Sequence, residues 1–131
     1  MLVITMYFGL NEAKIYWGCP KNSLVIQNQL GPGRILKYRC SSGDKDIVMG
    51  YLEFNTSKLI RFGESLSSRT LWKCVLEQGL WMSYSRKFIA YRGANLHRCA
   101  QVRKWIGKTD GIYFEKNLIK PPALALAWIK R

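Results

Sequence analysis

The 131-residue chain has a single histidine, His97, and only 8 Asp and Glu against 21 Lys and Arg. Acid–base catalysis needs two titratable groups that flank the reacting bond, commonly two histidines or two nearby carboxylates. The carboxylates here are scattered, apart from Asp44 and Asp46 in a polar stretch. GxSxG, HExxH and glycine-rich phosphate-binding motifs are all missing from the sequence. We therefore predict that the protein is not an enzyme.

The chain also lacks the clustered cysteines and histidines that bind metal ions. Its four cysteines, Cys19, Cys40, Cys74 and Cys99, are far apart and form no CxxC pair. We expect no metal and no cofactor. An even number of cysteines in a short chain is instead typical of an oxidising compartment, where each disulfide contributes about 2–4 kcal/mol. All four cysteines are disulfide candidates, and they indicate export.

No apolar run reaches the roughly 20 residues of a membrane-spanning helix, so no membrane span is expected. The shorter uncharged run from Leu2 to Leu10 is followed by the small residue Ala13. This pattern resembles the end of a signal peptide, and the alternative is a buried first strand. We predict a shortened signal peptide at residues 1–13 and one domain at residues 14–131, secreted to the extracellular space.

The formal net charge is +13, which favours acidic partners. Nucleic acid, anionic lipid, an acidic receptor and an acidic polysaccharide all qualify, and solubility alone also explains the charge. Aromatic and basic residues alternate in Tyr84–Phe88 and Arg103–Trp105, an arrangement that could stack bases. A strand with aromatics in the core and cations outside explains the alternation more simply. We therefore expect no specific nucleic-acid binding, and at most weak, salt-dependent binding to acidic polysaccharide.

Hydrophobic residues recur with a period of two, which predicts half-buried strands. In Leu36–Cys40 the cysteine faces the core, while Lys37 and Arg39 face outward, and Cys74 faces inward in the same way. A turn at Gly31–Gly33 precedes this strand, and a polar loop, Ser41–Asp46, follows it. Further strands are expected at Leu24–Leu30, Gly50–Phe54, Lys58–Phe62, Thr70–Leu76, Lys87–Arg92, Gln101–Ile106 and Gly111–Phe114.

The Asp110-Gly111 pair predicts a tight hairpin turn between the last two of these strands. The tail, Pro121–Arg131, fits either a strand or a short helix, and we favour a strand because its leucines and Trp128 alternate with alanines. Seven or eight short strands with regular turns predict an all-β, single-domain antiparallel β-sandwich, stabilised by disulfides. We expect a monomer.

The order of landmarks resembles the plant self-incompatibility protein homologue (S-protein homologue) family. The resemblance covers roughly Ser23–Lys130, and its separate motifs are weak alone but fairly specific in this order. The matching segments are Val25–Leu30, Cys40–Asp46, Thr70–Cys74, Cys99 with Trp105, Asp110–Tyr113 and the closing Trp128.

The chain departs from the family pattern at the cysteines. Arg103 replaces the usual second cysteine before the tryptophan, and Cys19 is an extra one. Because Cys40 and Cys74 both face inward, their sulfurs can meet across the core. The expected outcome is one bridge among Cys40, Cys74 and Cys99, with the third cysteine free or bonded to Cys19.

The resemblance implies a secreted, non-catalytic recognition or signalling ligand that binds a cell-surface receptor or another extracellular protein. The alternative is a basic defence protein that binds acidic polysaccharide or microbial membranes. Asn55-Thr56-Ser57 is a glycosylation sequon between two expected strands, so Asn55 is the candidate glycan site on an exported protein. The identity of the partner-binding residues does not follow from the resemblance.

Overall fold

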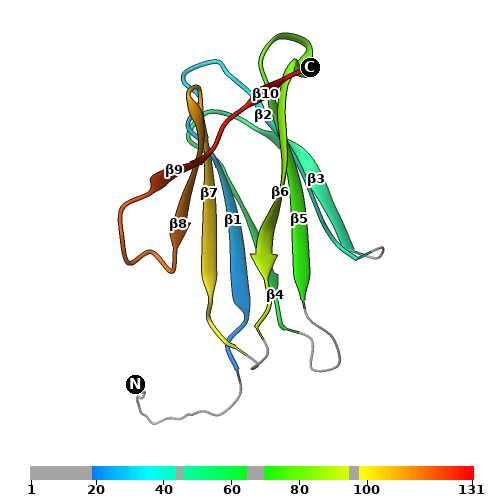
Figure 1. Ribbon diagram of the computed structural model, residues 1–131, viewed down its shortest axis with the longest axis vertical. Coiled ribbons are helices and arrows are strands. Elements are labelled where there is room, and N and C mark those ends of the chain that lie inside the picture. Colours follow the sequence, from blue (N-terminus) through cyan, green and yellow to red (C-terminus); the bar gives the residue numbers. More distant parts are fainter. Residues whose placement is uncertain (1–18, 44–45, 65–69, 95–97) are drawn as a thin grey trace.

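Two five-stranded sheets pack face to face in the computed structural model, which describes residues 19–43, 46–64, 70–94 and 98–131 (Figure 1). The first sheet has the strand order β4-β1-β7-β8-β9, and the second has the order β10-β6-β5-β2-β3. The strands are β1 (Asn22–Asn28), β2 (Leu36–Ser42), β3 (Asp46–Leu52), β4 (Ser57–Phe62), β5 (Leu71–Gln78), β6 (Tyr84–Arg92), β7 (Val102–Lys108), β8 (Gly111–Lys116), β9 (Ala123–Leu126) and β10 (Ile129–Lys130). The all-β sandwich predicted from the sequence is therefore confirmed.

The predicted alternation builds the core between the two sheets. In β1, Leu24 and Ile26 are fully buried, and in β2, Leu36 is fully buried while Arg39 is exposed. Complete burial of a large aliphatic side chain stabilises the folded state by about 1.5–3 kcal/mol relative to leaving it exposed. The period of two thus identified the inward faces of these strands correctly.

Two groups of aromatic rings connect the sheets. Phe62 of β4 lies 4.8 Å from Tyr91 of β6, with the rings nearly perpendicular. Trp105 of β7 lies 4.6 Å from Phe88 of β6 and donates its indole N–H to the Ala90 carbonyl at 3.0 Å. Such ring pairs add about 0.5–1.5 kcal/mol beyond their buried area, so they hold the two layers in one register.

Four features of the predicted architecture need correction. The structure has ten strands within the described residues instead of seven or eight, and β1 pairs with β7 in parallel, so the sandwich is not purely antiparallel. The predicted loop at Ser41–Asp46 is shorter, because β2 continues through Ser42 and β3 begins at Asp46. The tail forms two short strands, β9 and β10, in different sheets, and the helical alternative is wrong.

Both disulfides are formed. Cys40 and Cys74 are direct partners in the β2–β5 register, with Cα atoms 4.1 Å apart. Their bridge therefore lies within one sheet, and our expectation that it would cross the core is wrong. Cys99, the third cysteine of the set Cys40, Cys74 and Cys99, is bonded to Cys19. Of the two outcomes left open for it, free or bonded to Cys19, the second is therefore observed.

The interior also contains a polar residue with every hydrogen-bonding group used. The Asn28 amide, at the end of β1, donates to the Arg34 and Leu52 carbonyls at 2.8 and 2.7 Å and accepts from the Leu30 N–H at 2.8 Å. Because Asn28 is fully buried, these bonds tie the β1–β2 connection to β3 at little desolvation cost. The described residues include no helix of the length and hydropathy that crossing a membrane requires. The predicted signal peptide, residues 1–13, lies outside them.

Candidate partner-binding surface

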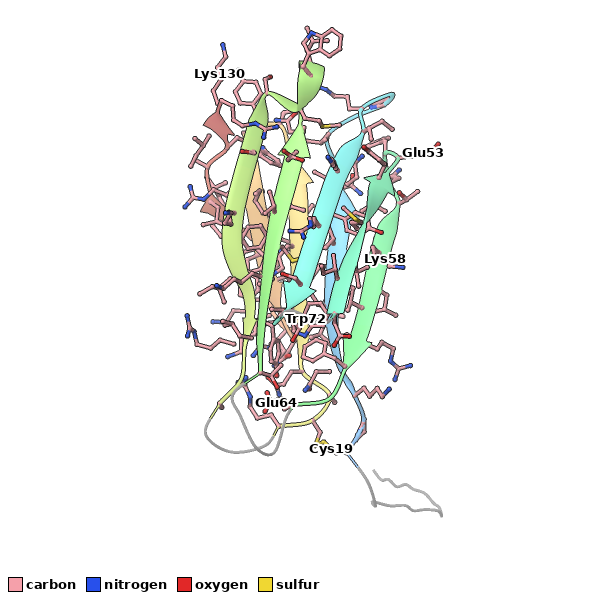
Figure 2. The ribbon with its side chains drawn as sticks, turned by 90° about the vertical axis from the view of Figure 1, so that its right-hand side faces the viewer. Cys19, Glu53, Lys58, Glu64, Trp72 and Lys130 are labelled. Carbon is pink, nitrogen blue, oxygen red and sulfur yellow. A yellow bond between two sulfur atoms is a disulfide. The ribbon has the colours of Figure 1, made fainter. Side chains whose placement is uncertain are left out.

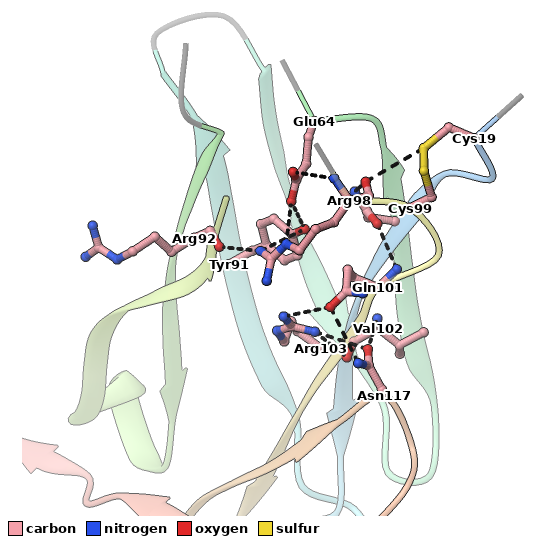
Figure 3. Close-up of polar contacts among 11 residues, drawn as sticks. Cys19, Glu64, Tyr91, Arg92, Arg98, Cys99, Gln101, Val102, Arg103 and Asn117 are labelled. Atoms are coloured by element: carbon pink, nitrogen blue, oxygen red, sulfur yellow. Dashed lines mark hydrogen bonds and ion pairs between the residues drawn. A yellow bond between two sulfur atoms is a disulfide. The ribbon is translucent and has the colours of Figure 1, made fainter. Parts of the chain in front are cut away.

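The Cys, Asp and Glu side chains in the part of the chain that the structure describes form no group of three that could hold a metal ion. Asp44, Lys45 and His97 lie outside the described residues. A polar network, shown in Figure 3, lies at the end of the sandwich that carries Cys19 and Glu64 in Figure 2.

This network is organised by the buried carboxylate of Glu64, just after β4. Tyr91 donates its hydroxyl hydrogen to Glu64 Oε2 (Figure 3). Arg98 donates its backbone N–H to Glu64 Oε1 at 3.0 Å and its Nε–H to Oε2 at 3.2 Å. These three donors satisfy the Glu64 carboxylate. The ion pair between Glu64 and Arg98 is therefore well compensated for the burial of the carboxylate.

The same contacts shift two pKa values in opposite directions. Burial by itself raises the pKa of Glu64, but the hydrogen bonds from Tyr91 and Arg98 outweigh it, and the net pKa is lowered. Burial, together with the hydrogen bond to Glu64, raises the pKa of Tyr91 to about 12. At neutral pH the carboxylate is therefore charged and the phenol neutral, an arrangement that holds structure together and leaves no group ready to exchange protons.

Arg103 lies in the interior on the same side of β7 as Trp105. Our expectation of cations outside is therefore wrong for Arg103, which is 7% exposed. Its Nη2 donates to Gln101 Oε1 at 3.0 Å, and its Nη1 donates to Asn117 Oδ1 at 3.1 Å. Its guanidinium also stacks near Tyr91. Burial lowers the pKa of Arg103, and the interaction with the Tyr91 hydroxyl opposes that shift.

The second disulfide closes this end of the sandwich. Cys99 follows Arg98 and is bonded to Cys19, which precedes β1. Asn22, the first residue of β1, donates to the Arg98 carbonyl at 3.3 Å and accepts from the Gln101 N–H at 2.7 Å. Because every one of these contacts joins chain segments to each other, we interpret this end as a structural clamp and look for the binding surface elsewhere.

The outward side of the second sheet has the composition of a recognition surface. We call it the outer face, and it consists of the outward side chains of β3, β2, β5 and β6. Its cations, in the middle of the sheet, are Lys37, Arg39, Lys73 and Lys87. Its large apolar side chains along β3 are Ile47, Met49 and Tyr51, which are 48%, 58% and 65% exposed.

Register places these two groups side by side. Arg39 is the direct partner of Met49 on β3, and Lys37 is the partner of Tyr51, with its Nζ 5.9 Å from the Tyr51 ring centroid. Glu77 on β5 lies beside these residues and forms ion pairs with Lys37 at 3.5 Å and with Arg131 at 2.7 Å. The outer face therefore combines a positive field with an apolar strip on an edge strand.

The candidate glycan site lies on the loop between β3 and β4. Asn55 is exposed and has a φ of 68°, and its Oδ1 accepts from Gln29 Nε2 at 2.7 Å. Thr56 Oγ1 donates to the Glu53 carbonyl at 2.6 Å. No hydrogen bond from Asn55 Nδ2, the atom that would carry a glycan, occurs in the described part of the chain. The loop geometry is thus compatible with modification.

Sequence reasoning missed the apolar strip of the outer face. The expected strand began at Gly50, so Ile47 and Met49 were left in or near a loop. The signal was nevertheless present, because Ile47, Met49 and Tyr51 alternate with Val48 and Gly50. Large apolar residues on an outward face do not stand out in a sequence, since the same alternation fits an inward face.

Comparison with known proteins gives a consistent result at full length. The family model for plant self-incompatibility protein S1 matches residues 23–128. S-protein homolog 14 from Arabidopsis thaliana is 45% identical over 130 residues, which cover 99% of this chain and 94% of that protein. S-protein homolog 25 from the same plant is 39% identical over 133 residues, covering 99% and 94%.

A solved structure agrees with the fold. It is similar with a TM-score of 0.68 and 33% sequence identity, over 85% of this chain and 96% of the other. That structure is described as belonging to SPH (self-incompatibility protein homologue) proteins, a widespread family of small, highly stable, secreted proteins from plants. The resemblance drawn from the cysteine, tryptophan and Asp-Gly landmarks is confirmed by both comparisons.

Proposed function

The chain belongs to the plant self-incompatibility protein S1 family, and from that premise we propose that it is a secreted, non-catalytic recognition ligand. Its partner is a cell-surface protein that it contacts through the outer face. The observation that carries this proposal is the direct pairing of Arg39 with Met49 and of Lys37 with Tyr51 on that face.

The composition of the outer face favours a protein partner over a simple polyanion. A polysaccharide or nucleic acid is held mainly by summed charge, which needs no exposed apolar side chains. Protein interfaces are enriched in Tyr, Met and Arg, and the outer face exposes Tyr51, Met49 and Arg39 together. The surrounding lysines would speed encounter with an acidic partner.

Export accords with the two disulfides and with the secreted character of the solved relative. A non-catalytic role accords with the network around Glu64, because its polar groups form hydrogen bonds to one another within the protein. The alternative is a basic defence protein that binds acidic polysaccharide or microbial membranes, and it rests on the net charge of +13.

The test compares two double variants with the same net charge. Arg39→Glu with Lys73→Glu reverses charge on the outer face, whereas Arg61→Glu with Lys116→Glu reverses two exposed cations on β4 and β8 of the other sheet. Labelled protein is titrated onto protoplasts from the tissue that expresses the gene. We expect saturable binding that the first variant loses and the second retains.

Equal losses in the two variants would mean that binding follows total charge, and the polyanion alternative would then replace the ligand proposal. Binding that does not saturate, or that acidic polysaccharide removes completely, would lead to the same conclusion. Thermal midpoints of both variants, measured alongside, establish that each is folded.

A further inference from the structure

The turn between β5 and β6 carries the most exposed large hydrophobic side chains of its end of the molecule. We call Leu80, Trp81 and Met82 the apolar tip. Leu80 is 77% exposed and Trp81 is 88% exposed, whereas most tryptophans in globular proteins are largely covered. Figure 1 shows this turn beside the C-terminal end of the chain, at the opposite end from the Cys19–Cys99 disulfide.

The backbone holds these side chains outward in a fixed and costly conformation. Trp81 and Met82 have φ values of 57° and 51°, in the left-handed region that side chains other than glycine rarely adopt. The preceding Gly79 has a φ of 89°, and a Cβ there would lie 3.0 Å from the Tyr84 ring. Strain of this kind persists only where surrounding contacts enforce it.

Those contacts come from the turn itself and from the last residue of the chain. The Met82 N–H donates to the Gly79 carbonyl at 3.0 Å, and the Ser83 N–H donates to the Leu80 carbonyl at 3.1 Å. Arg131 donates its backbone N–H to the Ser83 carbonyl at 2.7 Å and its Nη2–H to the Met82 carbonyl. The apolar tip is therefore preorganised in a projecting form.

Basic residues surround the tip. Arg34 and Ile35, from the β1–β2 connection, line the same shallow depression of about 310 Å³ as Leu80 and Met82. Lys130 pairs in register with Tyr84 at the base of the turn. The acids at this end are Glu53, Glu77 and Asp110, and of these Glu77 is paired with Arg131 and Lys37 while Asp110 accepts a hydrogen bond from Tyr113.

From this arrangement we propose that the apolar tip inserts into the interface of an anionic lipid bilayer, with the neighbouring cations on the lipid phosphates. Tryptophan suits that position because its ring is apolar and its indole N–H remains in contact with the headgroup layer. The positive end of the molecule complements a negatively charged leaflet. Lipid binding of this kind does not depend on the proposed function and places the outer face beside any membrane-bound partner.

The small size of the apolar tip favours a bilayer over a protein as its binding partner. A stable protein interface covers about 800 Å² on each partner. One tryptophan and one leucine on a convex turn bury far less, since a single aromatic residue supplies about 150–250 Å². Membrane association needs only a few inserted side chains together with electrostatic attraction.

The test measures partition of the oxidised protein onto vesicles, using either pure phosphatidylcholine or phosphatidylcholine with phosphatidylserine. Trp81→Asn removes the ring, and asparagine tolerates the positive φ of this position. Ile119→Asn is the matched control, because Ile119 is also 77% exposed but lies between β8 and β9 at the far end of β8. Circular dichroism and thermal midpoints establish that both variants fold.

We expect the wild type and Ile119→Asn to bind the anionic vesicles equally, and Trp81→Asn to bind at least about ten-fold more weakly. Lipids brominated on their acyl chains should quench tryptophan fluorescence in the wild type and not in Trp81→Asn. Equal binding of all three proteins would overturn the proposal in favour of charge alone. No vesicle binding by the wild type, with loss of protoplast binding in Trp81→Asn, would assign the tip to a protein partner.

Discussion

The guanidinium carbon of Arg103 lies 5.2 Å from the centroid of the Tyr91 ring, between the two sheets of the sandwich. The centroid of the same ring lies 5.5 Å from the guanidinium of Arg98, which is paired with the buried carboxylate of Glu64. A stacked and hydrogen-bonded arginine therefore connects β7 to β6.

Replacing Arg103 by alanine should strongly destabilise the fold. The change removes the charged donor from Gln101 Oε1 and Asn117 Oδ1, although the latter still accepts from the Val102 N–H at 2.7 Å. It also opens a cavity, and we expect a loss of about 2–4 kcal/mol in the free energy of unfolding. Chemical denaturation measures it. The matched control is Lys104→Ala, the next residue on β7, which should cost less than about 0.5 kcal/mol. Similar losses in the two variants would contradict the role assigned to Arg103.

Stability should fall in the alkaline range because of Tyr91. The folded protein holds the phenol proton to a pKa of about 12, above the ordinary value of 10.0. The resulting stabilisation is complete below pH 10, where both states are protonated, and decreases as the pH rises through 12 because only the unfolded state loses the proton. Tyr91→Phe should lack this part of the pH dependence. Denaturation curves collected between these pH values, with Tyr51→Phe at a 65% exposed position as the control, would reveal the difference. Parallel curves for Tyr91→Phe and wild type would refute it.

The two disulfides should differ in their access to reductant. Cys40 and Cys74 are fully buried, whereas Cys19 is exposed and Cys99 is half-buried. Because thiol–disulfide exchange requires direct attack on a sulfur, mild reductant should open Cys19–Cys99 first in the folded protein. Alkylation followed by peptide mass mapping identifies the order. Labelling of Cys40 before Cys19 would contradict the expected order. Replacing both Cys40 and Cys74 by alanine should lower the free energy of unfolding by about 2–4 kcal/mol.

Asn55 should carry an N-linked glycan when the protein passes through a plant secretory pathway. The chain has one sequon, and its asparagine is exposed on a loop. Ser57→Ala destroys the sequon and Ser57→Thr preserves it, so the pair separates glycosylation from any effect of the serine itself. A mass shift on glycosidase treatment is expected for the wild type and Ser57→Thr. Its absence in all three proteins would show that the sequon is not used.

Local alternation predicted the parts of the fold that depend on which face a residue occupies. Leu24, Tyr38 and Trp72 were recognised as inward because burial follows a period of two on each strand. Arg103 has the same parity as Trp105 and was still placed outside, because charged residues are rarely buried. Two of its partners, Tyr91 on β6 and Asn117 after β8, come from other segments of the chain, and no local pattern contains them.

Binding surfaces were harder to predict than the core. Leu80-Trp81-Met82 is an apolar run without alternation, and nothing in the sequence indicates that the backbone turns these side chains toward solvent. The outward direction of these side chains depends on the hydrogen bonds from Arg131 and on the conformation of Gly79. Both belong to the folded structure and cannot be read from the local sequence. The disulfide between Cys19 and Cys99 was only one of several open pairings for the same reason.

The parallel pairing of β1 with β7 has a consequence for how the protein is made. β1 is the first strand of the described chain, and one of its two neighbours, β7, begins at Val102. While the chain is being synthesised, β1 can pair with β4, but the backbone N–H and C=O groups of its other edge have no partner strand until β7 has emerged. The first sheet is therefore completed late, once β7 and the two strands that follow it in this sheet have been synthesised.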